Sequence, residues 1–429
     1  MSKVSRQSLL KPLLTIGGIA AASAALFASA QSEEILVWTD PARLAGFQMY
    51  QKIHPDVKMR IVTVDQGEQV AKIRLTTQAG AGSPDVIFMG SQPMPAQLAD
   101  PEIDYLLHLK DYVTSKTLNQ FAKGSNGFCT VGGKLLCLRN DLAQNVLWYN
   151  VKLMKDYGYT APKTWEEYEA LGLRAAKEHP GTVVGTLGDP QIISHFFYAS
   201  NCPISELSRT NANSVRINMA SVKCTRVAKM IDNLVKAGSL SSLSPFEPAF
   251  NKIAAEGNLL MIPTASWFGE YIIKPNYKVP AGQTSAAAPL RWNDERTTYT
   301  AGWGGGAFGV SKKAKNLKGA VDIMLWMTTS PENQTDAPTF PAHLPSADLW
   351  GKKVTADKYY ANDVYPVLKA AANNLTPAQA STRYAAWEPM TKYILPAIKD
   401  GKSVEAVLPA VQTEMVNLAR ASGYQVTTR

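Results

Sequence analysis

The segment TAGWGGGAFGV, residues 300–310, places one tryptophan before three consecutive glycines. Glycine has no Cβ, so other groups can approach its N–H and C=O closely. The indole of Trp303 offers a flat face on which the C–H face of a sugar ring can stack while its hydroxyls bond to backbone and polar side chains. The segment therefore predicts a carbohydrate site at Trp303, Gly304 and Gly305. The alternative is a glycine-rich turn before a strand, with Trp303 in the core.

Within the same segment, Gly304, Gly306 and Gly309 also fit the dinucleotide-binding pattern G-x-G-x-x-G. That pattern requires a strand before it and a helix that begins inside it. Residues 307–310 instead predict a strand that leads into the polar segment 311–315. The match is therefore weak, and we expect no cofactor.

The elements that must position such a site follow an α/β pattern. Apolar segments at 35–39, 57–64 and 85–89 predict strands. Two segments with helical spacing of apolar residues, 41–54 and 69–79, lie between them. The third strand is fully apolar, which is typical of a buried parallel strand. The sequence therefore predicts an α/β fold.

Polar residues follow the first and the third of these strands. Asp40 and Arg43 come after the first, and Ser91 and Gln92 come after the third. Ligands of parallel sheets collect at the carboxyl ends of strands, where the loops turn into helix N-termini. We expect these four side chains to face one cleft, although Asp40 is equally well placed to cap the helix that follows it.

A polar segment of seven residues, 139–145, separates two apolar strands and predicts a crossing between two lobes. The second of these strands is 146–149, and a short helix is expected at 150–159. Thr164 and Glu167 then predict a capping box, in which the Thr164 oxygen accepts from the Glu167 N–H while the Glu167 carboxylate reaches back.

The length of 429 residues exceeds what one compact core holds and also predicts two lobes. The net charge is +9, but the lysines and arginines are spread along the chain. We therefore expect no nucleic-acid partner.

The N-terminus has the pattern of a secretory signal. Three basic residues precede the uncharged stretch 12–27, which is followed by Ala28-Ser29-Ala30. This pattern predicts a signal peptide at residues 1–30, cleaved after Ala30. The apolar stretch is too short for a comfortable membrane span. The cleavage site has no cysteine, so a lipid anchor is not indicated. We therefore expect a free periplasmic protein.

All four cysteines lie beyond the predicted signal. An even number in an oxidising compartment predicts two disulfides. Proximity favours Cys129 with Cys137 and Cys202 with Cys224, and the two other pairings stay open. In the chain-entropy model each loop would stabilise the fold by roughly 2.5 to 3.5 kcal/mol. The cysteine spacing fits no zinc motif and the five histidines are scattered, so no metal site is expected.

The segment GGKLLCLRNDLAQNVLWYNVKLMKDYGYTAPKTWEEYEAL, residues 132–171, resembles a block of the extracellular solute-binding proteins that serve ATP-binding-cassette (ABC) sugar importers. In that maltose-binding-protein-like family the block runs G-K-x-Y-G-x-P, then Y-Y-N, then P-x-T-W-x-E. Further blocks follow in the family's order: Pro84-Asp85-Val86, Glu256-Gly257-Asn258, Leu260-Met261-Ile262, Gly302-Trp303-Gly304-Gly305-Gly306, Val310-Ser311-Lys312-Lys313 and Gly401-Lys402-Ser403. Together the blocks cover nearly the whole mature chain.

The resemblance implies a two-lobe periplasmic-binding-protein fold whose hinge closes on one sugar. Lobe I is expected to comprise residues 31–140 and 290–335, and lobe II residues 141–289 and 336–429. The implied function is capture of a mono- or oligosaccharide by a monomer, without catalysis. The partner would be an ABC permease in the inner membrane.

The resemblance also implies two further aromatic contacts besides Trp303. Trp267 follows the family's M-x-I…W pattern and resembles a stacking tryptophan of the second lobe. Trp387 resembles another tryptophan near the C-terminus. The three indoles are expected to hold the sugar.

Polar contacts carry over as well. Gln92 falls near the first-lobe polar ligand, where relatives often have Asp. Gln144, or its neighbours Asp141 and Asn145, falls where a crossing strand offers a hydroxyl partner. Asp189 lies near a second-lobe polar contact, although loop aspartates commonly form Asx turns. The missing first-lobe carboxylate leaves the sugar's identity open.

Two other kinds of function stay open. A secreted carbohydrate-active enzyme would need two carboxylates that face one glycosidic bond, and no local pair stands beside the aromatic residues. The other is a binding protein for a non-sugar cargo. The pair Tyr359-Tyr360 resembles the tyrosine pair of ferric-ion-binding relatives, and phosphorylated polyols or polyamines are further candidates.

Overall fold

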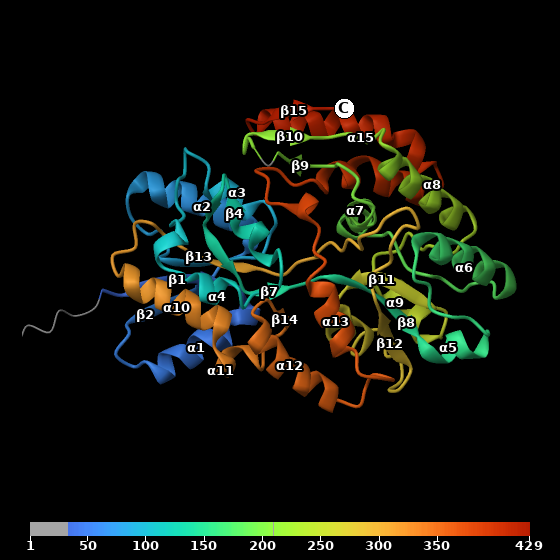
Figure 1. Cartoon of the computed structure of the whole chain (residues 1–429), viewed down its shortest axis with the longest axis horizontal. Coiled ribbons are helices and arrows are strands. Elements are labelled where there is room, and N and C mark those ends of the chain that lie inside the picture. Colours follow the sequence, from blue (N-terminus) through green and yellow to red (C-terminus); the bar gives the residue numbers. More distant parts are fainter. Residues whose placement is uncertain (1–32, 209) are drawn as a thin grey trace, which may run out of the picture. The chain divides into compact units, whose positions relative to one another are not determined.

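The computed structural model describes residues 33–208 and 210–429 (Figure 1). The predicted signal peptide and its cleavage site after Ala30 lie outside the described residues. Within the described ranges, no helix is both long enough and apolar enough to span a lipid bilayer.

Five strands form the first sheet, in the order β2-β1-β3-β13-β6. β1 (Ile35–Thr39), β2 (Met59–Thr63) and β3 (Val86–Met89) run parallel to one another. β13 (Ala307–Val310) is antiparallel to both of its neighbours, β3 and β6 (Cys137–Arg139). The predicted α/β fold with buried parallel strands is confirmed.

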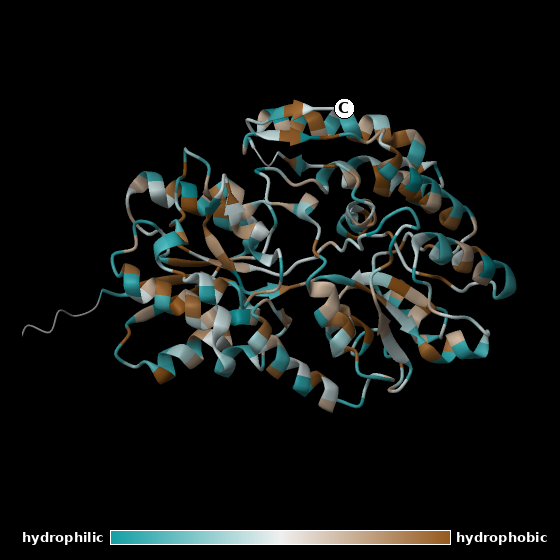
Figure 2. Ribbon diagram, viewed as in Figure 1, coloured by the Kyte–Doolittle hydropathy of each residue, from teal (hydrophilic) through white to brown (hydrophobic). Residues whose placement is uncertain are grey.

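Both faces of the first sheet are covered. Ile35 and Val37 of β1 pack in one hydrophobic cluster, whereas Leu36 and Trp38 pack in another. Burial on both sides explains why the strand is apolar at nearly every position. Figure 2 shows apolar colours along these strands and mixed colours on the surrounding helices. The helices that connect or cover this sheet are η1 (Pro41–Arg43), α1 (Leu44–Ile53), α2 (Gln66–Ala79), α3 (Met94–Leu98), η2 (Leu109–Asp111), α4 (Ser115–Leu118), η3 (Ser125–Cys129), α10 (Leu317–Thr329) and α11 (Pro331–Gln334).

A second sheet has three antiparallel strands in the order β11-β8-β12. β8 (Asn145–Asn150) lies in the centre, between β11 (Met261–Ala265) and β12 (Thr284–Ala287). Its Trp148 is buried, and the indole N–H donates to the carbonyl of Ala265 at 3.0 Å. The helices of this region are α5 (Val151–Asp156), α6 (Trp165–Glu178), α7 (Pro190–Ala199), α8 (Val222–Lys236), α9 (Pro248–Ala255) and η4 (Gly269–Ile273).

The polar segment 139–145 leads from β6 of the first sheet to β8 of the second. Within it, β7 (Asp141–Leu142) pairs with β14 (Phe340–Pro341). Gln144 forms a bridge to Gly302. The segment is largely buried despite its polarity, so its polar groups must find partners inside the protein.

A small third sheet joins the C-terminal strand to two strands from the middle of the chain, in the order β15-β10-β9. β10 (Ser214–Arg216) pairs in parallel with β15 (Gln425–Thr427) and antiparallel with β9 (Glu206–Leu207). The remaining helices are α12 (Leu344–Ala356), α13 (Tyr365–Ala372), η5 (Pro377–Gln379), η6 (Met390–Ile394), α14 (Leu395–Lys399) and α15 (Val404–Ala421). Among them, α15 packs against α8.

Two disulfides join Cys129 to Cys137 and Cys202 to Cys224. The pairing that sequence proximity favoured is therefore confirmed. The first bond ties η3 to β6, and the second ties the turn after α7 to α8.

A tight turn lies inside the first disulfide loop. It joins β4 (Thr130–Val131) to β5 (Lys134–Leu135). Gly132 and Gly133 have φ angles of 57° and 76°. Two consecutive left-handed residues favour glycine in a two-residue hairpin turn.

Of the two hydrogen bonds predicted for the capping box at the start of α6, one is present and the other has a different donor. The Thr164 hydroxyl accepts from the Glu167 N–H at 3.2 Å. The Glu167 carboxylate, however, accepts from the N–H of Lys163 at 2.7 Å rather than from that of Thr164. The backbone here is held beside Arg291, whose carbonyl accepts from the Trp165 N–H at 3.0 Å.

Candidate functional site

A cavity of about 510 Å³ opens beside the end of β3, the start of α2 and the first half of α7. Its volume lies within the roughly 300–1,000 Å³ that small-molecule sites span. Most of the lining residues are glycines or carry amide or hydroxyl groups. They are Gln66, Gly67, Gly90, Ser91, Gln92, Gly124, Ser125, Gly127, Phe128, Arg139, Gln191, Ser194, His195, Tyr198, Gly302, Gly304, Leu375, Thr376, Pro377, Gln379, Ala380 and Trp387.

The lining carries little charge. Among the described residues that form it, Arg139 is the only one with a formal charge, and none is aspartate or glutamate. His195 is neutral because burial lowers its pKa to about 3. Phe128, Tyr198 and Trp387 supply aromatic faces. The cavity therefore offers flat apolar surfaces, neutral hydrogen-bonding groups and one cation.

Ser91 and Gln92, which follow β3, line the cavity. Gln92 is also tied to the segment 375–383. Its Nε2 donates to the carbonyl of Ala380 at 2.9 Å, and its own carbonyl accepts from the Ser381 hydroxyl at 2.6 Å. These bonds hold one rim of the cavity against another.

The glycine-rich segment forms a further part of the wall. The carbonyl of Gly302 accepts from Nε2–H of His195 at 3.0 Å, and the Gln379 side chain bonds to the same residue. Gly304 has a φ of 87° and lines the cavity. Gly305 has a φ of 70° and does not line it. A Cβ on Gly305 would lie 2.7 Å from the Arg139 guanidinium, so packing also requires glycine there.

Of the three tryptophans predicted to contact the sugar, only Trp387 lines the cavity, and it is partly exposed. Trp303 is 5% exposed, with its ring 5.3 Å from that of Trp267 and 5.2 Å from that of Phe268. The Trp267 indole N–H donates to the carbonyl of Trp303 at 2.7 Å. Trp267 and Trp303 thus pack in an aromatic cluster outside the lining, while the neighbouring Gly304 belongs to it.

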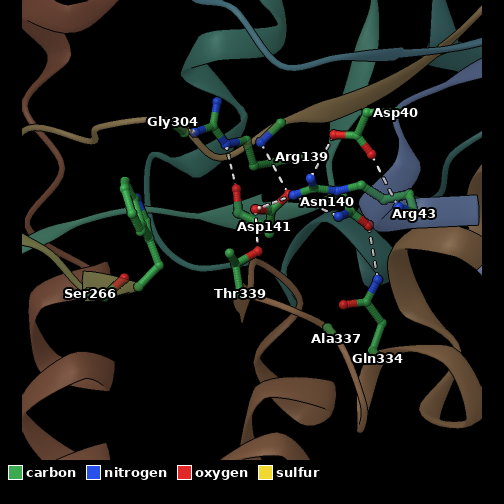
Figure 3. A network of polar contacts seen from close by, with 12 residues as sticks. Asp40, Arg43, Arg139, Asn140, Asp141, Ser266, Gly304, Gln334, Ala337 and Thr339 are labelled. Carbon is green, nitrogen blue, oxygen red and sulfur yellow. Dashed lines mark hydrogen bonds and ion pairs between the residues drawn. The ribbon is translucent and has the colours of Figure 1, made fainter. Parts of the chain in front are cut away.

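Asp40 and Arg43 belong to an ion network rather than to the cavity lining (Figure 3). Arg43 donates to Asp40 at 2.8 Å and to Asp141 at 2.9 Å. Burial alone would lower the pKa of Arg43, but the two carboxylates outweigh it and raise that pKa. Asp40 also accepts from the Arg43 N–H at 3.1 Å, which is the capping role that its position allowed.

Asp141 is fully buried and its two carboxylate oxygens are occupied. One accepts from the Asn140 side chain at 2.9 Å and from the Gly306 N–H at 3.1 Å. The other accepts from Arg43 and from the Thr339 hydroxyl. These bonds give Asp141 a structural role, and it does not line the cavity.

Gln144 and Asp189 also bond within the protein. Gln144 is fully buried, with its Nε2 donating to the carbonyl of Leu368 at 2.9 Å and its Oε1 accepting from Ser266 at 3.3 Å. Asp189 caps α7, accepting from the Gln191 N–H at 2.8 Å, and burial raises its pKa. Neither residue is part of the lining.

One protein family matches most of the chain. The family described as bacterial extracellular solute-binding protein matches residues 45–362, well over half of the sequence. The chain belongs to this family. The suspected resemblance is therefore confirmed at the level of the family.

Solved structures of solute-binding proteins share the fold. The galacto-N-biose/lacto-N-biose I-binding protein of an ABC transporter from Bifidobacterium longum, in complex with lacto-N-biose, has a TM-score of 0.74 at 20% identity, over 93% of this chain and 99% of that one. The sugar-binding protein MalE from Xanthomonas citri has a TM-score of 0.72 at 16% identity, over 90% and 98%. Similarity at these identities shows the fold alone, which is the mixed α/β fold of two-lobe periplasmic binding proteins.

A curated relative matches over a shorter range. The probable ABC transporter-binding protein of Deinococcus radiodurans is 26% identical over 224 residues, 48% of this chain. The match spans 50% of that relative's own length.

Ser91, Gln92, Gly304 and Trp387 were predicted from the sequence, whereas the other lining residues of this solute-binding protein, among them Ser125, Arg139, His195 and Gln379, were missed. The Cys129–Cys137 disulfide was a usable signal for Ser125 and Arg139, because it brings η3 and the end of β6 together. No local pattern marks His195 or Gln379. In the described part of the chain, no group of three or more His, Cys, Asp or Glu side chains is arranged to hold a metal ion.

Proposed function

We propose that this solute-binding protein captures a mono- or oligosaccharide in the cavity and delivers it unchanged to an ABC importer in the inner membrane. The observation that carries the proposal is the lining, in which Trp387 stands among amide and hydroxyl groups such as those of Ser91 and Gln92. A sugar ring combines an apolar C–H face with a rim of hydroxyls and fits such a surface. The lacto-N-biose bound to the Bifidobacterium longum protein supports the same class of ligand.

Capture depends on closure of two lobes in this proposal. Lobe I comprises residues 31–140 and 290–335, and lobe II comprises 141–289 and 336–429. Under this division, Gln92 on the lining would belong to lobe I and His195 to lobe II. A solute that touches both lobes stabilises the closed form by the contacts that exist only there. The protein works as a monomer in the periplasm, after removal of residues 1–30.

Binding is favoured over hydrolysis. A glycosidase needs two carboxylates on either side of the scissile bond, roughly 5 to 9.5 Å apart. Among the described residues that line the cavity, none is aspartate or glutamate. Incubation of the protein with oligosaccharides, followed by chromatography, is expected to return them at full length.

A ferric-ion cargo is not favoured by the tyrosine pair. The Tyr359 hydroxyl donates to the carbonyl of Val279 at 2.8 Å, and the Tyr360 hydroxyl donates to Glu270 at 2.6 Å. Burial raises the pKa of Tyr359 and that of Tyr360. Both phenols are thus occupied and protonated, and neither lines the cavity.

The test is isothermal titration calorimetry of the purified protein against neutral and acidic mono-, di- and trisaccharides. A dissociation constant near the micromolar range, about −8 kcal/mol, is expected for at least one of them. No heat of binding across the whole panel would contradict the proposed function.

A further inference from the structure

One wall of the cavity contains two buried polar atoms without a hydrogen-bond partner among the described residues. Arg139 is 6% exposed and its Nη1 has no acceptor, while Ser125 is 2% exposed and its Oγ has no partner. Both residues line the cavity. Buried groups of this kind are costly unless a partner reaches them, and charged ones most of all. Their coincidence on one wall points to a ligand that supplies an acceptor.

The guanidinium of Arg139 is bonded only to backbone carbonyls. Its Nε donates to Asp141 O at 2.9 Å and its Nη2 donates to Gly304 O at 3.2 Å. The Asp141 carboxylate attracts this cation, but all its hydrogen bonds go to other groups, as described above. No carboxylate of the described chain forms a salt bridge with Arg139.

No other lining group balances this charge. The described lining residues include no acidic side chain, and His195 is neutral. The N-terminus of α2 already holds the Asp65 carboxylate, and that of α7 holds Asp189. A negative charge on the solute therefore finds its complement at Arg139.

The two unpartnered atoms sit on elements that are fastened to each other. The Cys129–Cys137 disulfide ties η3, which carries Ser125, to β6, which ends at Arg139. The guanidinium carbon lies 4.1 Å from the centre of the Phe128 ring. Because the backbone of this wall is fixed before the ligand arrives, it loses little entropy on binding.

We propose that this wall is a carboxylate subsite and that the solute is an acidic saccharide, in which a uronic acid ring accepts hydrogen bonds from Arg139 and Ser125. The inference rests on the saccharide-binding function proposed above. One guanidinium matches one negative charge. A phosphate ester, with a charge of about −1.5 to −2 at neutral pH, would remain partly uncompensated. Nη1 and Oγ are enclosed in the wall, so we expect small side-chain rotations to turn them toward the solute.

The first experiment compares matched ligands on the unaltered protein by calorimetry at pH 7. Di- and trisaccharides of galacturonate, glucuronate, mannuronate and guluronate are each paired with the neutral sugar of the same linkage, and sugar phosphates form a third arm. At least one uronate is expected to bind roughly 10- to 100-fold more tightly than its neutral partner, as for a hydrogen bond to a charged group.

Three results would overturn the inference, and they differ in what else they affect. If neutral sugars bound as tightly as their uronates, the preference for acidic saccharides would be contradicted, whereas the proposed saccharide-binding function would stand. Preference for sugar phosphates would remove the carboxylate assignment. If no saccharide gave a heat of binding, both the proposed function and this inference would be contradicted.

Variants then test the two side chains. Arg139→Gln is expected to weaken uronate binding roughly 10- to 100-fold and to leave the affinity for the neutral partner nearly unchanged. A merely structural role would weaken both ligands alike and would contradict the assignment. Arg60→Gln, a matched change at a side chain that is 57% exposed, serves as the control. Ser125→Ala, expected to cost roughly 3- to 10-fold for the uronate alone, keeps the test decisive if Arg139→Gln does not fold.

Discussion

The side chain of Gln379 binds both backbone polar groups of Gly302. Its Oε1 accepts from the Gly302 N–H at 2.6 Å, and its Nε2 donates to the Gly302 carbonyl at 2.6 Å. The pair joins segment 375–383 to the glycine-rich wall, and both residues line the cavity. The geometry of the cavity therefore depends on an amide, which alone can donate and accept in this arrangement.

Replacement of this amide by a carboxylate is expected to damage the site. Gln379→Glu loses the donor and places an acceptor against the Gly302 carbonyl. We expect a loss of about 1–3 kcal/mol in the free energy of unfolding and weaker solute binding. Urea denaturation and calorimetry measure the two effects, with Gln283→Glu, outside the cavity, as the matched control. Unchanged stability and affinity would show that the paired bonds are unimportant.

Trp387 is expected to contribute to affinity more than to stability, since it is partly exposed on the cavity wall. Trp387→Ala removes an apolar face worth about 1.5–3 kcal/mol when covered by a solute, a roughly 10- to 100-fold rise in Kd. The control is Trp326→Ala, which removes a partly buried indole that packs on Tyr50 away from the cavity. Equal loss of affinity in both variants would argue against stacking on Trp387.

Asp141 is expected to be essential for stability. Asp141→Asn keeps the side-chain shape but leaves the largely buried Arg43 cation, whose side chain is 12% exposed, with Asp40 as its remaining carboxylate partner. Breaking a buried ion pair costs about 3–5 kcal/mol. Glu34→Gln breaks the exposed pair with Arg60 and is expected to cost less than about 1 kcal/mol. Denaturant unfolding of both variants checks the contrast, which equal losses would refute.

His195 is expected to make the protein less stable in acid. The folded protein keeps this imidazole neutral down to about pH 3 because it is buried, whereas in the unfolded chain it takes up a proton near pH 6.5. Between these values the unfolded state binds one more proton, so stability falls as the pH falls, by up to about 1.4 kcal/mol per pH unit.

His195→Gln tests this dependence, because it keeps a donor for Gly302 without a titrating ring. Its unfolding free energy, measured in urea from pH 7 to pH 4, is expected to fall less steeply than that of the unaltered protein. His108→Gln removes an exposed imidazole and serves as the control. Parallel curves for His195→Gln and the unaltered protein would exclude this role.

The two disulfides are expected to differ in what their removal affects. Replacing either pair by serine should cost roughly 2.5 to 3.5 kcal/mol of stability. Loss of the Cys129–Cys137 bond should also weaken solute binding, because it frees η3, which contributes Ser125, Gly127 and Phe128 to the lining. Loss of the Cys202–Cys224 bond should leave affinity nearly unchanged. Calorimetry below the unfolding transition separates these outcomes, and equal affinities in both variants would contradict the distinction.

Much of the fold could be predicted because its signals are local. Strands β1 and β13 lie at the predicted residues, since each is a short apolar run with polar neighbours. The helix predicted at 41–54 instead begins with the 3-10 turn Pro41–Arg43 before α1. Disulfide pairing followed from sequence distance alone.

The site was harder to predict, because burial depends on residues far apart in the chain. Nothing near Trp303 reveals that its indole packs against Trp267 and Phe268, which come from another segment. Asp141 has the residue type of a ligand contact, but Arg43 and Thr339 occupy it. Arg139 was not predicted as a lining residue, because its position on the cavity wall depends on the register of β6 and on the disulfide beside it.

The two titratable groups discussed above, His195 and Arg139, keep the same charge over a wide range of pH. His195 does not gain a proton until about pH 3, and Arg139, with its pKa lowered to about 10 by burial, does not lose one until far above neutrality. Between roughly pH 4 and pH 9 the electrostatic character of the cavity in the folded protein is constant. If the proposed function is right, the lining is expected to select among solutes in the same way while its surroundings acidify or turn alkaline.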